Sequence, residues 1–152
     1  MPKDVTLHVY QLAPSQGGSF MSRFLPGLGM GAYHTSLEID GYRYTFAANA
    51  GIIKTLSRNE GLPEGANFQE SVTLGTTACS AEQLKDVLDR MATKFHNNAY
   101  HLVHRNCNHF SETFATACCL YNELPDCKDT KQLSTYPSFV NRLANTGRSV
   151  VG

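Results

Sequence analysis

Short stretches rich in alternating apolar and polar residues recur along the chain, and a spacing of two is typical of half-buried β-strands. Val5, Leu7 and Val9 share one face of the first stretch. Asp40-Gly41 between the second and third stretches is the signature of a two-residue hairpin turn. The hairpin puts His34 opposite Ala47 and Ser36 opposite Thr45. The predicted strands are residues 5–12, 32–39, 42–47, 69–74 and 100–104.

Two longer stretches have the spacing of helices. Ser80 and Gln83 form a capping box, and five apolar residues follow at helical spacing: Leu84, Val87, Leu88, Met91 and Phe95. A second helix begins after Asn106 and has Phe110, Phe114 and Ala117 on its apolar face. Shorter helices are expected at 19–25 and 137–144. We expect residues 48–53 to turn away from the hairpin, and residues 54–70 and 121–135 to be loops.

This order of elements predicts an α+β fold, with a small antiparallel sheet and helices packed on it. The 152 residues are enough for one domain spanning 1–152. The net charge is zero and there is no basic stripe, which argues against binding to nucleic acid or anionic membranes. No apolar run is long enough for a membrane span, and no leader is recognised at the N-terminus. We therefore expect a protein of the cytosol, or one shared with the nucleus.

The cysteine content points away from disulfides and metals. The chain has five cysteines, an odd number that does not suggest a disulfide framework. A zinc site could be drawn from His101, His104, Cys107 and His109, but these spacings fit no closed structural site. A break between strand and helix would also separate the ligands. We expect no metal and no cofactor.

Cys107 is the candidate nucleophile. It lies at the predicted start of a helix, where unpaired N–H groups and the helix dipole favour a thiolate over a thiol. The alternative is a buried, inert helix cysteine, and position alone leaves both open. A base would have to come from a distant strand, since His109 is too close along the same helix. His34 is the candidate, although spacing alone favours a sheet histidine bonded to a neighbour.

The segments Tyr33-His-Thr-Ser-Leu-Glu-Ile39 and Asn106-Cys-Asn-His-Phe-Ser111 together resemble the PPPDE peptidases, also called desumoylating isopeptidases. Residues 9–12, 44–52 and 137–144 extend the resemblance over most of the chain. It implies a papain-like fold, circularly permuted so that histidine precedes cysteine. It also implies a dyad of Cys107 and His34 that removes ubiquitin or SUMO-like modifiers from lysines. Some relatives pair as dimers, so a homodimer is a further expectation.

Two more residues are candidates for supporting roles. The Cys107 N–H is the natural donor to the oxyanion, and Gln11 is the candidate for a second donor. Gln11 also departs from the family pattern, because many relatives carry an acidic residue there. Asn49 is the candidate for orienting His34, if the hairpin register continues that far.

Two other functions remain open. The same dyad would serve an S-acyl-protein thioesterase or acyltransferase, which an exposed apolar segment at residues 20–25 would favour. The third hypothesis is a catalytically silent adaptor that binds a modifier. A buried Cys107, or a His34 far from it, would favour the adaptor.

Overall fold

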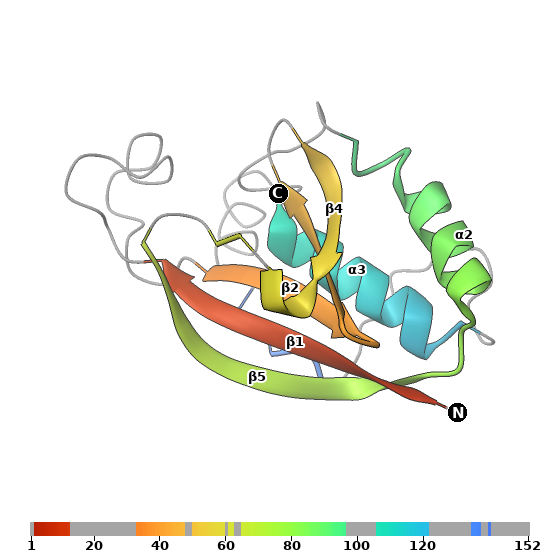
Figure 1. Cartoon of the computed structure of the whole chain (residues 1–152), viewed down its shortest axis with the longest axis horizontal. Coiled ribbons are helices and arrows are strands. Elements are labelled where there is room, and N and C mark those ends of the chain that lie inside the picture. The colour runs from red at the N-terminus through yellow and green to blue at the C-terminus, as the bar shows by residue number, and fades with distance from the viewer. Residues whose placement is uncertain are drawn as a thin grey trace, which may run out of the picture.

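The computed structural model describes residues 2–12, 33–47, 50–59, 61–62, 65–96, 106–121, 135–137 and 140. These residues form an antiparallel sheet with helix α3 packed on one face and helix α2 against α3 (Figure 1). The predicted α+β class is confirmed. Among the described residues, no helix is long and apolar enough to cross a membrane.

The five strands lie in the order β4-β3-β2-β1-β5, and every neighbouring pair is antiparallel. The strands are β1 (Lys3–Leu12), β2 (Tyr33–Ile39), β3 (Tyr42–Ala47), β4 (Gly51–Leu56) and β5 (Ala66–Thr77). The helices are a short 3-10 turn η1 (Ser57–Asn59), α2 (Ala81–Met91) and α3 (Cys107–Cys119).

The hairpin between β2 and β3 has the predicted turn. Asp40 and Gly41 both have positive φ, at 53° and 81°, as a two-residue hairpin turn of this kind requires. Ile39 pairs with Tyr42, in the predicted register. The ladder stops at Leu37–Tyr44, however, so the two outer pairs that the hairpin predicted for His34 and Ser36 are not formed. Beyond this point β2 and β3 diverge.

The prediction for residues 48–70 was wrong in two places. Residues 51–56 form β4, which pairs with all of β3, and β5 begins at Ala66 and runs for 12 residues. Both are edge strands, and most of the side chains of β5 are exposed or half-buried. An edge strand is stabilised by backbone hydrogen bonds to one neighbour, so it needs few apolar residues and leaves a weak sequence signal.

Both predicted helix caps are confirmed. The Ser80 side chain accepts from the Gln83 N–H, and the Gln83 side chain accepts from the Ser80 N–H. Helix α2 is shorter than predicted, because it ends at Met91 while Phe95 is buried just beyond it. The predicted elements at 19–25 and 100–104 lie outside the described residues, as do most of the segments 121–135 and 137–144.

An aromatic cluster joins the sheet to α3. Phe110 lies at its centre, with ring centroids 5.5 Å from Phe95 and 5.6 Å from Phe114. Phe46 of β3 contacts Phe95 at 5.1 Å. All four rings are essentially inaccessible to solvent, so this cluster orients α3 on the sheet.

Replacing Phe110 should therefore be costly. We expect Phe110→Ala to lower the free energy of unfolding by about 3–5 kcal/mol, because it removes a fully buried ring and leaves a cavity. Phe68→Ala is the matched control, since Phe68 is 62% exposed, and should cost less than about 1 kcal/mol. Urea unfolding of both variants measures the difference. Equal losses would show that the cluster does not hold the fold together.

Candidate functional site

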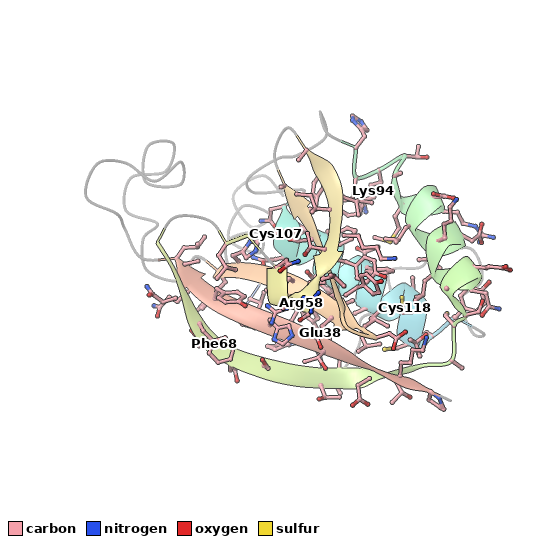
Figure 2. The ribbon with its side chains drawn as sticks, viewed as in Figure 1. Glu38, Arg58, Phe68, Lys94, Cys107 and Cys118 are labelled. Atoms are coloured by element: carbon pink, nitrogen blue, oxygen red, sulfur yellow. The ribbon has the colours of Figure 1, made fainter. Side chains whose placement is uncertain are left out.

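Cys107 is the first residue of α3, as predicted, and it is 5% exposed. Asn106 caps the helix, because its side chain accepts from the N–H groups of Asn108 and His109. His109 completes a capping box, because its Nδ1 accepts a hydrogen bond from the Asn106 N–H at 3.1 Å. His109 is thus used as a cap, which agrees with its exclusion as the base. Figure 2 shows Cys107 at the end of α3 that lies beside the first residues of β2.

The side chain of Asn108 attaches the start of α3 to β2. Its Nδ2 donates to the Tyr33 carbonyl oxygen at 3.0 Å, and its Oδ1 accepts from the Thr35 hydroxyl at 2.8 Å. Tyr33 and Thr35 are the two neighbours of His34. The backbone of the candidate base is therefore held at the end of the helix that begins with the candidate nucleophile.

These bonds occupy the edge of β2 that β3 leaves open. The carbonyl groups of Tyr33 and Thr35 point to the same edge, because alternate residues of a strand do so. Asn108 donates to the first, and the Thr45 hydroxyl donates to the second at 3.1 Å. Side chains thus replace the backbone ladder where the two strands diverge, and one of them, Asn108, comes from the start of α3.

Three more groups complete this arrangement. Ser111 Oγ lies 3.0 Å from Thr35 Oγ1, and the Tyr136 hydroxyl donates to the Asn108 carbonyl at 3.0 Å. Asn108 Nδ2 also donates to the Val140 carbonyl at 3.2 Å. Thr35 has one hydroxyl proton, which it gives to Asn108, so Ser111 can donate to Thr35 in turn. We call Asn108, Thr35, Ser111 and Tyr136 the Asn108 clamp.

The clamp is dry. Thr35 and Ser111 have no exposed surface, and burial raises the pKa of the Tyr136 hydroxyl well above its usual range. By its residue type alone, Asn108 is a residue that ends strands and caps helices, and its local spacing does not predict the clamp. The signal that could have found the clamp is the presence of Thr35 and Ser111 on apolar faces, where a polar side chain needs a partner.

The His34 side chain points to the other side of β2 from Thr35, since neighbouring residues of a strand alternate. It is 8% exposed, and its ring lies against Tyr10 with centroids 6.0 Å apart. For His34 to meet Cys107 Sγ, its side chain has to reach around the open edge of β2, next to Asn108.

Of the two residues predicted to have supporting roles, the structure describes only Gln11. Gln11 is exposed near the end of β1 and pairs with Tyr33, so it lies on the face of the sheet that α3 covers. It is thus close in register to the backbone that Asn108 binds. Asn49 lies outside the described residues.

A comparison with protein families decides the class of the chain. Residues 3–151 match the model of the PPPDE putative peptidase domain. The chain belongs to the PPPDE peptidase family. An antiparallel sheet with the cysteine at a helix start, after the histidine in sequence, is consistent with the permuted papain-like fold that the motifs implied.

Curated relatives carry related names. A DeSI-like protein of Arabidopsis thaliana is 30% identical over 94% of this chain and 56% of its own length. A desumoylating isopeptidase 1 homolog of Caenorhabditis elegans is 28% identical over 96% of this chain and 40% of its own length. The DeSI-like protein sdu1 of Schizosaccharomyces pombe is 30% identical over 94% of this chain and 65% of its own length. The chain therefore spans roughly half the length of these relatives.

The face of the sheet opposite α3 carries a connected set of polar side chains in this PPPDE domain. His8 lies between Ser71 and Glu38, with Nδ1 2.7 Å from Ser71 Oγ and Nε2 3.0 Å from Glu38 Oε1. The remaining bonds run from Glu38 through Ser57 and Arg43 to the Tyr10 hydroxyl. We call Ser71, His8, Glu38, Ser57, Arg43 and Tyr10 the outer-face network. It links β5, β1, β2, η1 and β3.

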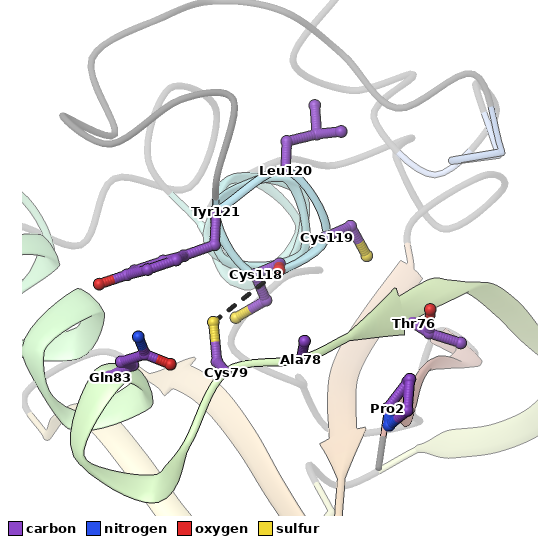
Figure 3. A pocket seen from close by; sticks show the side chains of 9 residues that line it. All are labelled: Pro2, Thr76, Ala78, Cys79, Gln83, Cys118, Cys119, Leu120 and Tyr121. Atoms are coloured by element: carbon purple, nitrogen blue, oxygen red, sulfur yellow. Dashed lines mark hydrogen bonds between the residues drawn. The ribbon is translucent and has the colours of Figure 1, made fainter.

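A pocket of about 340 Å³ lies at the other end of α3 (Figure 3). Cys79, Cys118 and Cys119 line it, and the Cys79 thiol donates to the Cys118 carbonyl at 4.0 Å. Burial raises the pKa of Cys119 to about 11, with a smaller contribution from Cys79. At neutral pH Cys119 is therefore a thiol, which is a poor nucleophile. Within the described part of the chain, no three His, Cys, Asp or Glu residues are arranged to hold a metal ion.

The Asn108 clamp should stabilise the fold. We expect Thr35→Val to lower the free energy of unfolding by about 1–3 kcal/mol, because it keeps the shape but leaves Asn108 Oδ1 with only the longer, weaker 3.6 Å contact from the Cys107 thiol. Thr73→Val is the control, since Thr73 is exposed on β5, and should change stability by less than about 0.5 kcal/mol. Urea unfolding compares the two. A neutral Thr35→Val would mean that the clamp adds nothing.

The outer-face network should make stability depend on acid pH. The Ser57 hydroxyl, with smaller help from His8 and Arg43, lowers the pKa of Glu38 below its usual 4.5. A lowered carboxyl pKa contributes stability above the unfolded value, and this is lost as pH falls through the folded value. Glu38→Gln should therefore be less stable than the native chain at pH 7, and the gap should close below about pH 4.5. Thermal midpoints of the native chain and of Glu38→Gln, measured from pH 7 to 3, test this. When Ser57→Ala is also present, Glu38→Gln should lower the midpoint at pH 7 by less, because the largest cause of the lowered pKa is gone.

Proposed function

We propose that this chain is a cysteine isopeptidase that removes ubiquitin or SUMO-like modifiers from the lysines of target proteins. The observation that supports this most directly is the Asn108 clamp. It holds both neighbours of His34 at the start of the helix that begins with Cys107. A nucleophile at a helix start and a base from a distant strand are what cysteine catalysis needs.

The proposed reaction has two steps. The Cys107 thiolate attacks the carbonyl of the modifier's C-terminal glycine, and protonated His34 gives its proton to the departing lysine amine as the C–N bond breaks. His34 then takes a proton from water, which attacks the thioester and releases the modifier with a free carboxylate. The C–S bond breaks to expel the Cys107 thiolate while His34 keeps the proton from water, so the thiolate and protonated histidine that begin the reaction are restored.

The oxyanion of each step needs donors. The N–H of Cys107 is aligned with the positive end of the α3 dipole and is the first donor. The helix cap engages the following N–H groups, those of Asn108 and His109. Gln11 is the proposed second donor, because its register against Tyr33 puts it on the α3 face.

The low exposure of both residues fits a narrow substrate. Cys107 and His34 are 5% and 8% exposed. A modifier tail that ends in two glycines has no side chains near the cleaved bond, so it can reach a thiol that a bulkier peptide cannot. The name of the Caenorhabditis elegans relative, a desumoylating isopeptidase, favours SUMO as the first modifier to test.

The same burial favours a second candidate, a silent adaptor that binds a modifier without cleaving it. The thioesterase reading depends on residues 20–25, which lie outside the described residues. The expected homodimer and the expected location in the cytosol or nucleus stay predictions.

The deciding experiment uses ubiquitin and SUMO that carry a C-terminal electrophile. We expect one of them to form an adduct with the native chain, detected by intact mass, and Cys107→Ala to lose it. Cys119→Ala should keep the adduct, because that thiol lies at the other end of α3 and is protonated at neutral pH.

Three outcomes separate the candidates. An adduct lost only in Cys107→Ala supports the isopeptidase. No adduct, with Cys107 still alkylated selectively by iodoacetamide at pH 7, contradicts it and favours thioester chemistry. Absence of both reactions, with a modifier that still binds, leaves the adaptor.

A further inference from the structure

We propose that Tyr10 is a positioning residue for His34, and that Arg43 holds the Tyr10 ring in place. This inference rests on the proposed function, in which His34 is the base. It assigns to the outer-face network a role in the site on the opposite side of the sheet.

Tyr10 connects the network to His34. The two residues pair directly between β1 and β2, and their rings lie 6.0 Å apart at an angle of 42°. Residues that pair directly in an antiparallel sheet point to the same face, so both rings lie on the face away from α3. Tyr10 is therefore a neighbour that limits the directions in which the imidazole can turn.

The Tyr10 ring is itself fixed on two sides. Arg43 Nη1 donates to its hydroxyl at 2.6 Å, and Phe68 packs edge-on against the ring with centroids 5.8 Å apart. Only 6% of Tyr10 is exposed. Figure 2 shows Phe68 projecting from β5, the strand on the far side of β1 from His34. The ring is thus held between Phe68 and His34.

Arg43 is held in turn. Its Nε donates to Ser57 Oγ at 2.8 Å and lies 3.5 Å from Glu38 Oε1, while Ser57 donates to the same carboxylate at 2.5 Å. Ser57 belongs to η1, the turn after β4. Ser57 and Glu38 both contact Nε, and Nη1 makes the third contact, to Tyr10. Because the guanidinium is planar and rigid, a fixed Nε gives the contact to Tyr10 a defined direction as well.

His34 needs such support because of where it lies. Its backbone is held by the Asn108 clamp, but its side chain must reach around the open edge of β2 to meet Cys107. An imidazole free to rotate would lose the geometry for proton transfer much of the time.

The test compares four variants on a modifier substrate with a fluorogenic leaving group. Tyr10→Leu removes the ring and should lower kcat about tenfold or more with KM within about twofold, since positioning affects the chemical step and not binding. Tyr10→Phe and Arg43→Met keep the ring but remove the bond between them, and each should lower kcat by about threefold. Tyr42→Leu is the matched control on β3, 38% exposed, and should keep the native kcat.

A second readout does not depend on peptidase activity. The Cε1–H resonance of His34, assigned by its loss in His34→Asn, should move in Tyr10→Leu and stay in Tyr42→Leu. If the native chain hydrolyses no modifier, the proposed function fails, but a moved resonance still supports the contact. Should Tyr10→Leu not fold, Tyr10→Met replaces it, because it fills a similar volume without a ring.

Two results would overturn the inference. One is Tyr10→Leu, or Tyr10→Met in its place, with native kcat and an unmoved His34 resonance. The other is a loss of activity that appears as a raised KM at unchanged kcat, which would make Tyr10 part of substrate binding. Native kcat in both Tyr10→Phe and Arg43→Met would remove Arg43 from the proposal.

Discussion

The amide of Asn108 is the contact on which the candidate site depends. It joins the start of α3 to two carbonyl groups far away in the sequence, those of Tyr33 and Val140, and accepts from Thr35. Such a bond is worth little net energy when it is exchanged for water, but it is costly to break in a dry interior. The orientation of α3 relative to β2 is therefore specified more sharply than apolar packing alone would specify it.

The divergence of β2 and β3 makes room for this contact. A continued hairpin ladder would have used the carbonyl groups of Tyr33 and Thr35 and closed the edge against the helix. Instead β3 pairs along its full length with β4, while side chains satisfy the free edge of β2. An opened edge inside a sheet is thus where a helix start and a strand histidine can meet.

The two faces of the sheet have different physical roles. One face packs on α3 through the aromatic cluster around Phe110, whose rings are almost completely buried. The other face is ordered by directional bonds among the side chains of the outer-face network. His34 points to this second face. It therefore lies beside the outer-face network, while the apolar core lies on the other side of its strand.

Much of this could be predicted from the sequence, because the signals were local. The Asp40-Gly41 turn, the capping box of α2, the Asn106 cap of α3 and the position of Cys107 depend on residues a few positions apart. The edge strands β4 and β5 could not be read fully, since backbone pairing to one neighbour requires little of their side chains. The paired motifs identified the family, but they did not contain the geometry that joins them.

What the sequence determined by itself is the class of the protein and its two candidate catalytic residues. Only the tertiary structure decided that β2 pairs with β3 from Leu37 onward and not before it, that Asn108 occupies the opened edge, and that Tyr10 faces His34. The contacts of Asn108 with Tyr33 and of Tyr10 with His34 join segments that are distant in the sequence, and the β2–β3 ladder ends where the first of them forms. Their formation depends on which segments the core brings together, and no local spacing of residue types records that.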